Sequence, residues 1–361
     1  MKGMRYKQIE DVLYQNAIKE GIPLAGEFEL TSRCNFSCKM CYLPTNDKNI
    51  LARERTSKEW LLLAKEARNA GMLYLLLTGG EVFMRKNFFD IYKEISDMGF
   101  ITTIYTNASM ITSEIAYKLG RIPPLLIEAT LYGASSETYG RVCGNPDGFE
   151  NAKRGIELML AEGMQVSLKT TLIRDNVEDY DSIFEFADKN GIGLRHVKYI
   201  SPSRDRCNNL VADCRLCPEE QVKINLHASK RFDDRLKSIK QNNEPNELMV
   251  FDKHKEILRN NSNVFKCASG SCCFWITWEG KMTPCGLMSE PSFSPFEIGF
   301  TNAWNKLKES CNSIPECKEC VECSIKKYCN RCPARLKNET GFYNKPAPYL
   351  CEMAQKLKEH N

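Results

Sequence analysis

The chain has 361 residues, 42% of them hydrophobic and 27% charged, which is enough for one large domain and a smaller one. No apolar run approaches the roughly 18 residues that a membrane span requires, and the N-terminal segment lacks the layout of a signal peptide. The 50 basic and 46 acidic residues give a net charge of only +4, which does not indicate a nucleic-acid partner. We therefore expect a cytoplasmic protein that binds neither nucleic acid nor membrane.

Short apolar runs alternate with segments of helical periodicity between residues 24 and 200. The predicted strands are 24–31, 72–78, 101–106, 125–131, 164–172 and 193–200. The predicted helices are 56–71, with Thr56 or Ser57 as its N-cap, then 87–98, 112–120, 148–162 and 177–190. This alternation predicts an α/β fold with a parallel sheet covered by helices. Six units rather than eight predict a partial (β/α)6 barrel of the TIM type, open on one side.

The rest of the chain divides around this barrel. Residues 1–23 are predicted to be an N-terminal helical extension, 24–200 the barrel, and 201–265 a helical bridge. Residues 266–361 are predicted to be a cysteine-rich C-terminal domain of short strands and turns. In barrels of this kind, the chemistry lies on the loops at the carboxyl ends of the strands.

Eighteen cysteines are distributed unevenly along the chain. Three lie at 34–41, four are scattered between 143 and 217, and eleven follow residue 266. Disulfide scaffolds are usually short secreted chains, whereas clustered cysteines in a cytosolic protein indicate metal binding or catalysis. We therefore expect one metal site near the start of the barrel and others at the C-terminal end.

The first cysteine group, Cys34-x3-Cys38-x2-Cys41, directly follows the first predicted strand. A [4Fe–4S] cluster normally takes four thiolates, so three would leave one iron open. Zinc, which usually takes four ligands from paired knuckles, and unligated thiols are the alternatives. The loop resembles the hallmark of the radical S-adenosylmethionine (SAM) superfamily. That resemblance implies that the open iron binds SAM, which is cleaved reductively to a 5′-deoxyadenosyl radical.

Further segments resemble the SAM-binding residues of this superfamily. The segment after the second strand, which would bring its backbone close to the SAM amino group, is Thr78-Gly79-Gly80-Glu81. Met40 stands where the family often has an aromatic residue near the adenine, and Thr130 matches a hydroxyl residue that contacts SAM. Arg154 resembles an arginine that pairs with the SAM carboxylate, with a solvated helix charge as the alternative. Lys169 is a weaker candidate.

The C-terminal cysteines resemble the SPASM domain, which accompanies radical SAM barrels that act mostly on peptides and proteins. The matching pattern is Cys267-x12-Gly280-x4-Cys285, then Cys320-x2-Cys323-x5-Cys329-x2-Cys332, then Cys351. The resemblance implies two auxiliary [4Fe–4S] clusters, three clusters in all. The first would use Cys267, Cys273, Cys285 and Cys332, and the second Cys320, Cys323, Cys329 and Cys351.

Two features depart from the SPASM pattern. The last spacing has two residues where the family usually has three, which affects the assignment of Cys332. Cys272 stands beside Cys273, and the distance from Cys267 favours Cys273. Zinc is again the alternative metal. The cysteines without a matching ligand position are Cys143, Cys207, Cys214, Cys217, Cys272, Cys311 and Cys317.

These extra cysteines have three interpretations. Ordinary reduced thiols are the simplest. Cys207-x6-Cys214-x2-Cys217 is a candidate for a further metal site. Alternatively, one of these thiols donates a hydrogen atom to a substrate radical, as in some epimerases.

The substrate is indicated only by resemblance. Residues 131–140 and 148–150 resemble maturases of ribosomally synthesised peptides, which implies a net oxidative modification such as a crosslink or thioether. Formylglycine formation, as in anaerobic sulfatase maturases, is an alternative, but Gly286 stands where those enzymes have an aspartate. Peptide epimerisation and dehydrogenation of a small molecule such as an amino sugar are further alternatives.

The expected partners follow from this chemistry. Reduced flavodoxin or ferredoxin would supply the electron. Only 33 residues precede Cys34, whereas a leader-binding domain takes about 80 in related maturases. We therefore expect a separate leader-peptide-binding protein or a short substrate.

Overall fold

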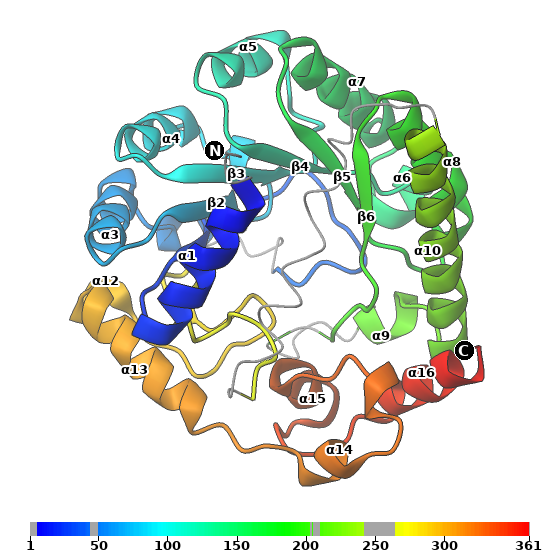
Figure 1. The fold of residues 1–361 in the computed structure, drawn as a ribbon. Coiled ribbons are helices and arrows are strands. Elements are labelled where there is room, and N and C mark those ends of the chain that lie inside the picture. The colour runs from blue at the N-terminus through cyan, green and yellow to red at the C-terminus, as the bar shows by residue number, and fades with distance from the viewer. Residues whose placement is uncertain (1–5, 44–49, 203, 205–209, 242–263, 361) are drawn as a thin grey trace.

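The computed structural model describes residues 6–43, 50–202, 204, 210–241 and 264–360. Eight strands form one sheet in the order β6-β5-β4-β3-β2-β1-β7-β8. The first six strands are parallel and curve into a partial barrel with helices outside (Figure 1). They are β1 (Ala25–Glu29), β2 (Tyr74–Thr78), β3 (Ile101–Thr106), β4 (Leu126–Thr130), β5 (Val166–Thr170) and β6 (Gly193–His196). The predicted α/β partial barrel is confirmed.

All but the two shortest of the helices between these strands lie where the periodicity predicted them. They are α2 (Ile50–Arg53), α3 (Ser57–Asn69), α4 (Phe88–Asp97), α5 (Ser113–Arg121), α6 (Ser136–Cys143), α7 (Gly148–Ala161) and α8 (Tyr180–Lys189). The 3-10 turns η1 (Val82–Met84) and η2 (Val177–Asp179) precede α4 and α8. Thr56 is the N-cap of α3, because its hydroxyl accepts from Glu59 N and the Glu59 carboxylate accepts from Thr56 N. The short helices α2 and α6 were not predicted.

The two faces of the barrel sheet differ in polarity. Ile104, Ile127 and Leu168 are fully buried in the main core beneath the outer helices. Because side chains alternate along a strand, the neighbouring residues Tyr105, Glu128 and Lys169 face the inside of the barrel. The apolar face therefore stabilises the fold, and the inner face carries charge.

The C-terminal region was predicted to consist of short strands and turns, and this was wrong for most of it. In its described residues, only β7 (Cys273–Ile276) and β8 (Met282–Thr283) are strands. The remainder is helical because short amphipathic segments begin after prolines and glycines. These elements are α12 (Pro295–Ile298), α13 (Phe300–Asn312), α14 (Lys318–Glu322), η4 (Lys326–Tyr328), α15 (Pro333–Thr340) and α16 (Pro348–Glu359).

This region also extends the barrel sheet. β7 pairs in parallel with β1, in a register that places Cys273 opposite Ala25 and Trp275 opposite Glu27. Helices α12 to α16 lie on the side of the molecule opposite α5 and α7 (Figure 1). The C-terminal cysteines are thereby brought next to the first strand of the barrel.

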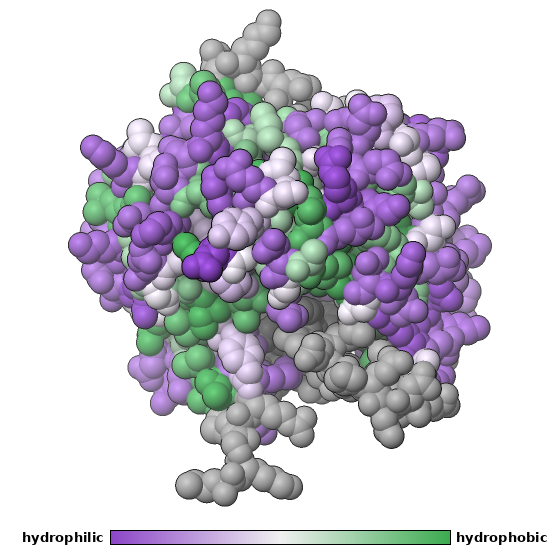
Figure 2. All heavy atoms as spheres, turned by 90° about the horizontal axis from the view of Figure 1, so that it is seen from above, coloured by the Kyte–Doolittle hydropathy of each residue, from purple (hydrophilic) through white to green (hydrophobic). Residues whose placement is uncertain are grey.

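The remaining helices cover the outside of the molecule. They are α1 (Tyr6–Glu20), α9 (Leu210–Cys214) and α10 (Pro218–Gln241), which packs against α16. Among the described helices, none is long and apolar enough to cross a membrane. Hydrophilic residues predominate on the face seen in Figure 2, with apolar residues interspersed.

Candidate active site

The three cysteines of the first group lie together on the loop that follows β1. Cys34, Cys38 and Cys41 are partly exposed, and each lies close enough to another for its charge to act on that thiol. The backbone N–H groups of Phe36 and Leu43 point at Cys34 Sγ and Cys41 Sγ, both at 3.4 Å. Such N–H groups stabilise thiolates and tune clusters that are bound to them. The loop is therefore arranged to receive a cluster.

Without iron, these thiols resist ionisation. Burial raises the pKa of Cys34 to about 12, and the neighbouring Glu81, Cys38 and Cys41 add to this rise. Burial likewise raises the pKa of Cys41 to about 11. Three thiolates side by side therefore require a compensating positive charge, which the iron ions of a cluster would provide.

The Thr78–Glu81 segment packs against the residues that lead into this loop. Gly80 N donates to Thr31 O, and Glu81 N donates to Arg33 O, both at 2.8 Å. A Cβ on Gly79 would lie 2.3 Å from Thr31 O, and one on Gly80 would lie 2.3 Å from Arg33 O. Both glycines are thus required by the close approach of this segment to Thr31 and Arg33.

Glu81 is fully buried and holds the end of β3. Its carboxylate accepts from Asn107 N at 2.7 Å, from Thr106 Oγ1 at 2.9 Å and from Phe83 N at 3.2 Å. The Asn107 amide then lies 3.7 Å from Cys34 Sγ and donates to Asn35 Oδ1 at 2.9 Å. Glu81 therefore positions the cluster loop through Asn107.

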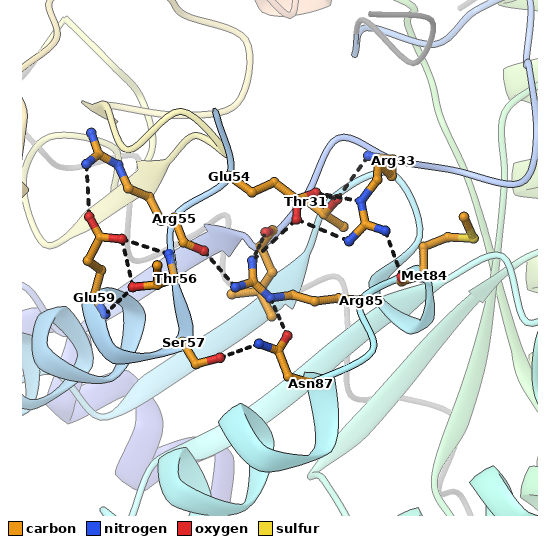
Figure 3. A network of polar contacts seen from close by, with 11 residues as sticks. Thr31, Arg33, Glu54, Arg55, Thr56, Ser57, Glu59, Met84, Arg85 and Asn87 are labelled. Atoms are coloured by element: carbon orange, nitrogen blue, oxygen red, sulfur yellow. Dashed lines mark hydrogen bonds and ion pairs between the residues drawn. The ribbon is translucent and has the colours of Figure 1, made fainter. Parts of the chain in front are cut away.

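A polar network fixes the segment just before Cys34 (Figure 3). Arg33 forms a two-pronged ion pair with Glu54, at 2.8 and 3.1 Å, and donates to Met84 O at 3.0 Å. Arg85 donates to Leu30 O at 2.7 Å and to Arg55 O at 2.6 Å. These bonds tie the end of β1 to the loops before α3 and after β2.

The side chains that are predicted to contact SAM differ in their position and exposure. Met40 is buried within the cluster loop, and Thr130 is partly buried at the carboxyl end of β4. Arg154 is exposed on α7, where it donates to Asn151 Oδ1 at 2.9 Å. Met40 and Thr130 thus lie at the end of the barrel that carries the cluster loop. The Arg154–SAM contact stays a prediction.

Charged side chains line the inside of the barrel. Arg195 on β6 donates to both oxygens of Glu128, at 2.7 Å each, and Lys169 Nζ lies 3.8 Å from the same carboxylate. The Arg195 and Lys169 side chains remain 48% and 26% exposed. Burial raises the pKa of the nearby Glu27 to about 8, and burial lowers that of Lys169. This layer offers two cations that solvent can reach.

A buried ion pair joins the barrel to the C-terminal region. Glu29 at the end of β1 accepts from Arg204 Nη2 and from Trp278 N, both at 3.1 Å. Arg204 also stacks over the Tyr42 ring at 5.4 Å and lies 3.5 Å from Gly286 O. The cluster loop and the loop that carries Cys285 are therefore tied to one carboxylate.

The first set of four C-terminal cysteines is brought together around Cys267. Burial raises the pKa of Cys285, and the neighbouring Cys332 and Cys267 add to this rise. Cys267 acts in the same direction on Cys273 and Cys332. Cys273 also hydrogen-bonds the adjacent Cys272, which is fully buried. These four thiols lie at the junction of β7 with the barrel.

The second set lies farther along the chain, on α14, η4 and α16. Burial raises the pKa of Cys329, and Cys351 and Cys323 add to this rise. Burial also raises the pKa of Cys320 to about 12, with a contribution from its hydrogen bond to Cys317. The second set thus forms a neighbourhood of its own, with Cys317 as a fifth thiol.

The other extra cysteines have varied surroundings. Cys311 is buried near Cys267, whereas Cys214 is buried and its thiol lies 3.6 Å from Val211 O. Cys217 is exposed, and Cys207 lies outside the described residues. No three His, Cys, Asp or Glu side chains in the described part of the chain are arranged to hold a single metal ion.

Two site residues were missed by the sequence analysis. Tyr132 lies near all three thiols of the cluster loop, close enough for their charges to act on its hydroxyl. Cys143, at the end of α6, lies beside the cluster loop, where its carbonyl oxygen accepts from Ser37 N at 2.9 Å. The signal for Tyr132 was its place two residues after Thr130. Nothing in the spacing of Cys143 indicated its position, because it depends on the unpredicted helix α6.

The sequence profile of the Radical SAM superfamily matches residues 28–187, which span β1 to α8 and include the cluster loop. This part of the chain is therefore similar to radical SAM domains, a class that uses SAM with a [4Fe–4S] cluster.

Relatives align beyond this domain. The chain is 25% identical over 336 residues to an AdoMet-dependent heme synthase of Methanosarcina barkeri, covering 89% of this chain and 94% of that protein. It is 29% identical over 165 residues to an Fe-coproporphyrin III synthase of the same organism, covering 46% of this chain and 41% of that protein.

Two solved structures share the fold. Streptococcus suis SuiB bound to S-adenosylmethionine superposes with a TM-score of 0.69 at 14% identity, covering 96% of this chain and 84% of that one. Native anSMEcpe with bound AdoMet gives 0.69 at 15% identity, covering 94% and 96%.

Proposed function

We propose that this chain is a radical SAM oxidoreductase with three [4Fe–4S] clusters, two of them in a SPASM-type C-terminal region. The observation that carries the proposal is that the cysteines lie in three neighbourhoods, which contain the predicted set of three and the two predicted sets of four. A set of three leaves one iron open for SAM, whereas a set of four completes a cluster. The first would be held by Cys34, Cys38 and Cys41.

The bound cluster and SAM would supply a 5′-deoxyadenosyl radical, which abstracts a hydrogen atom from a substrate C–H bond. The protein positions these groups. The Thr78–Glu81 segment and Thr130 would border the SAM site, and Met40, buried in the cluster loop, would shield the cluster. The Glu29–Arg204 pair keeps the cluster loop next to the C-terminal region. Reduced flavodoxin or ferredoxin is the proposed electron donor.

The auxiliary clusters are proposed to accept an electron from the substrate, so that the reaction is a net oxidation. The first would use Cys267, Cys273, Cys285 and Cys332, and the second Cys320, Cys323, Cys329 and Cys351. Cys267 lies near enough to Cys273 to raise the pKa of that thiol, which supports Cys273 over Cys272 as the ligand. Cys332 lies near enough to Cys285 to raise the pKa of that thiol, and Cys267 acts on Cys332 in the same way, which supports Cys332 as a ligand despite its short spacing.

A ribosomally synthesised peptide is the first candidate substrate, from the resemblance of residues 131–150 to peptide maturases. A separate leader-binding protein would then be a partner.

An iron tetrapyrrole is the second candidate substrate. It is favoured by the alignment with a heme synthase over nearly the whole length of both chains. Such molecules carry carboxylate side chains, and Lys169 and Arg195 are cations on the inner face of the barrel that solvent can reach. The same cations would also suit an acidic side chain of a peptide.

Anaerobic reconstitution tests the proposal. We expect about twelve iron and twelve sulfide per chain, against a few zinc for the alternative metal, and reductant-dependent 5′-deoxyadenosine. Fe-coproporphyrin III and candidate precursor peptides are then added separately, and oxidised products are sought by mass spectrometry. Product from only one class identifies the substrate. A chain that binds zinc and makes no 5′-deoxyadenosine would refute the proposal.

A further inference from the structure

A cavity of about 200 Å³ lies where α10 and α16 pack side by side and the segment after β6 meets them (Figure 1). None of the residues proposed above to hold a cluster or to contact SAM lines this cavity. Its volume is below the roughly 300–1,000 Å³ of pockets for drug-sized molecules, so a smaller ligand fits it. We call it the α10–α16 cavity.

The wall that the two helices provide is apolar. Val222 and Leu226 line it from α10, and Leu350 and Met353 line it from α16. Val222 and Leu350 are buried, at 2% and 4% exposure, whereas Leu226 and Met353 are partly buried. A hydrocarbon body placed against this wall would leave water on both sides of the cavity, which favours binding of an apolar molecule.

The remaining wall is positively charged. Lys198 and Arg335 both line the cavity, and none of the described residues that line it is acidic. The Lys198 ammonium has no ion pair or hydrogen bond with any described residue. Arg335 donates to Asn330 O at 2.7 Å and stacks over the Tyr199 ring at 4.7 Å, which fixes its guanidinium beside the cavity. Two cations without a carboxylate partner suit an anion.

The cavity also borders the second cysteine set of the C-terminal region. Tyr328 and Asn330, which line it, stand on either side of Cys329 in the chain. Leu350 precedes Cys351 on α16. A molecule in the cavity would therefore contact the segments that carry two of these thiols.

We infer that the α10–α16 cavity binds a small apolar molecule with an anionic head, a carboxylate or a phosphate, and that this molecule stabilises the segments around Cys329 and Cys351. The apolar body packs between α10 and α16, and the head pairs with Lys198 and Arg335. A ligand that binds only the folded form of these segments shifts their equilibrium toward that form. The site is separate from the inner face of the barrel, where the substrate is proposed to react.

The test uses the reconstituted full-length protein with octanoate and octyl phosphate as probes and 1-octanol as the neutral comparison. Calorimetry measures binding, and hydrogen exchange with and without probe locates it. Lys198→Met removes a cation that has no partner in the described chain, so the fold should not change. Ser229→Phe fills the cavity from an exposed position on its wall. Lys223→Met is the control, because Lys223 lies on α10 outside the cavity and is 62% exposed.

We expect at least one of the two anions to bind about tenfold or more tightly than 1-octanol. It should slow exchange in residues 328–335 and in α16. Lys198→Met should weaken this binding about tenfold, Ser229→Phe should abolish it, and Lys223→Met should leave it unchanged. Absence of binding by both anions would overturn the inference. So would equal affinity for 1-octanol, wild-type affinity in Lys198→Met, or protection confined to other parts of the chain.

Discussion

The cysteine loop after β1 and the second cysteine set of the C-terminal region are stabilised in different ways. The loop lies over a large core that includes Phe28, Leu30 and Trp60, all fully buried. It is also bonded to three neighbouring segments through the Arg33 network, Glu81 and the end of α6. Its three thiols are therefore held in place by the rest of the barrel.

The second set has much less support. Its hydrophobic cluster contains six buried residues, and two of them are cysteines, Cys317 and Cys320. Cys323 and Cys329 flank short helical turns that could not persist alone. A small core of this kind usually needs a metal or disulfides for stability. We therefore expect that the barrel holds its three thiols in place without a cluster, whereas the C-terminal segment would need the proposed auxiliary cluster in order to fold.

The strongest test of this comparison removes the first cluster. In a variant with Cys34, Cys38 and Cys41 all replaced by alanine, we expect no 5′-deoxyadenosine, because only the open-iron cluster binds SAM. About two-thirds of the iron should remain. Hydrogen exchange in the barrel should match the wild type, since the core does not depend on these thiols. Cys217→Ala, at an exposed cysteine, is the control. Full SAM cleavage in the triple variant would contradict the central proposal.

The second test removes the cluster that is proposed for the second cysteine set of the C-terminal region. Replacing Cys320, Cys323 and Cys329 together with alanine should abolish the oxidised product but leave some uncoupled SAM cleavage. About two-thirds of the iron should again remain. Here we expect faster hydrogen exchange in residues 317–351, because cluster binding contributes to the folding of this segment. Exchange rates equal to the wild type would show that the segment folds without its cluster.

The same contrast explains what the sequence could predict. The barrel strands and helices were placed correctly because apolar periodicity recurs in each unit, with caps such as Thr56 and Thr112. Helix α6 was missed because it spans only eight residues, Ser136–Cys143, which are too few to show a clear helical periodicity. The C-terminal helices were missed because cysteines interrupt their periodicity.

The site could be predicted only where its residues belong to a short sequence motif. The spacing of Cys34, Cys38 and Cys41 on one loop indicated that these thiols lie together. The pairing of Glu29 with Arg204 could not be predicted, because 174 residues separate the two in the sequence. The parallel pairing of β7 with β1 could not be predicted either, because no local sequence pattern indicates which strands become neighbours.

A third test weakens the connection between the two regions. Arg204→Met would leave Glu29 buried without its cation, which should reduce the free energy of unfolding by about 3–5 kcal/mol. Arg53→Met is the matched control, because Arg53 also pairs with a C-terminal glutamate, Glu279, but both side chains are more than 40% exposed. We expect about 0–1 kcal/mol for that pair. Denaturant unfolding of both variants measures the difference, and equal losses would show that the buried pair has no special role.

The smallest expected effect concerns Arg154, at the edge of the barrel site. The residue lies on α7, whose first residue, Gly148, packs against Phe36 of the cluster loop. Because Arg154 is exposed, Arg154→Ala should change the free energy of unfolding by no more than about 0.5 kcal/mol. If the guanidinium pairs with the SAM carboxylate, SAM binding should weaken by about 1.5–3 kcal/mol.

Equilibrium binding of SAM to the reconstituted variant measures this loss, with Arg121→Ala on the exposed end of α5 as the control. Because stability is expected to stay nearly constant, a loss of affinity would report a direct contact rather than a disturbed fold. The effect should also shrink at high salt, since a solvent-exposed ion pair is screened. An affinity equal to that of Arg121→Ala would assign Arg154 to the solvated surface of α7, bonded only to Asn151. The SAM carboxylate would then need another cation, and Lys169 inside the barrel is the next residue to replace.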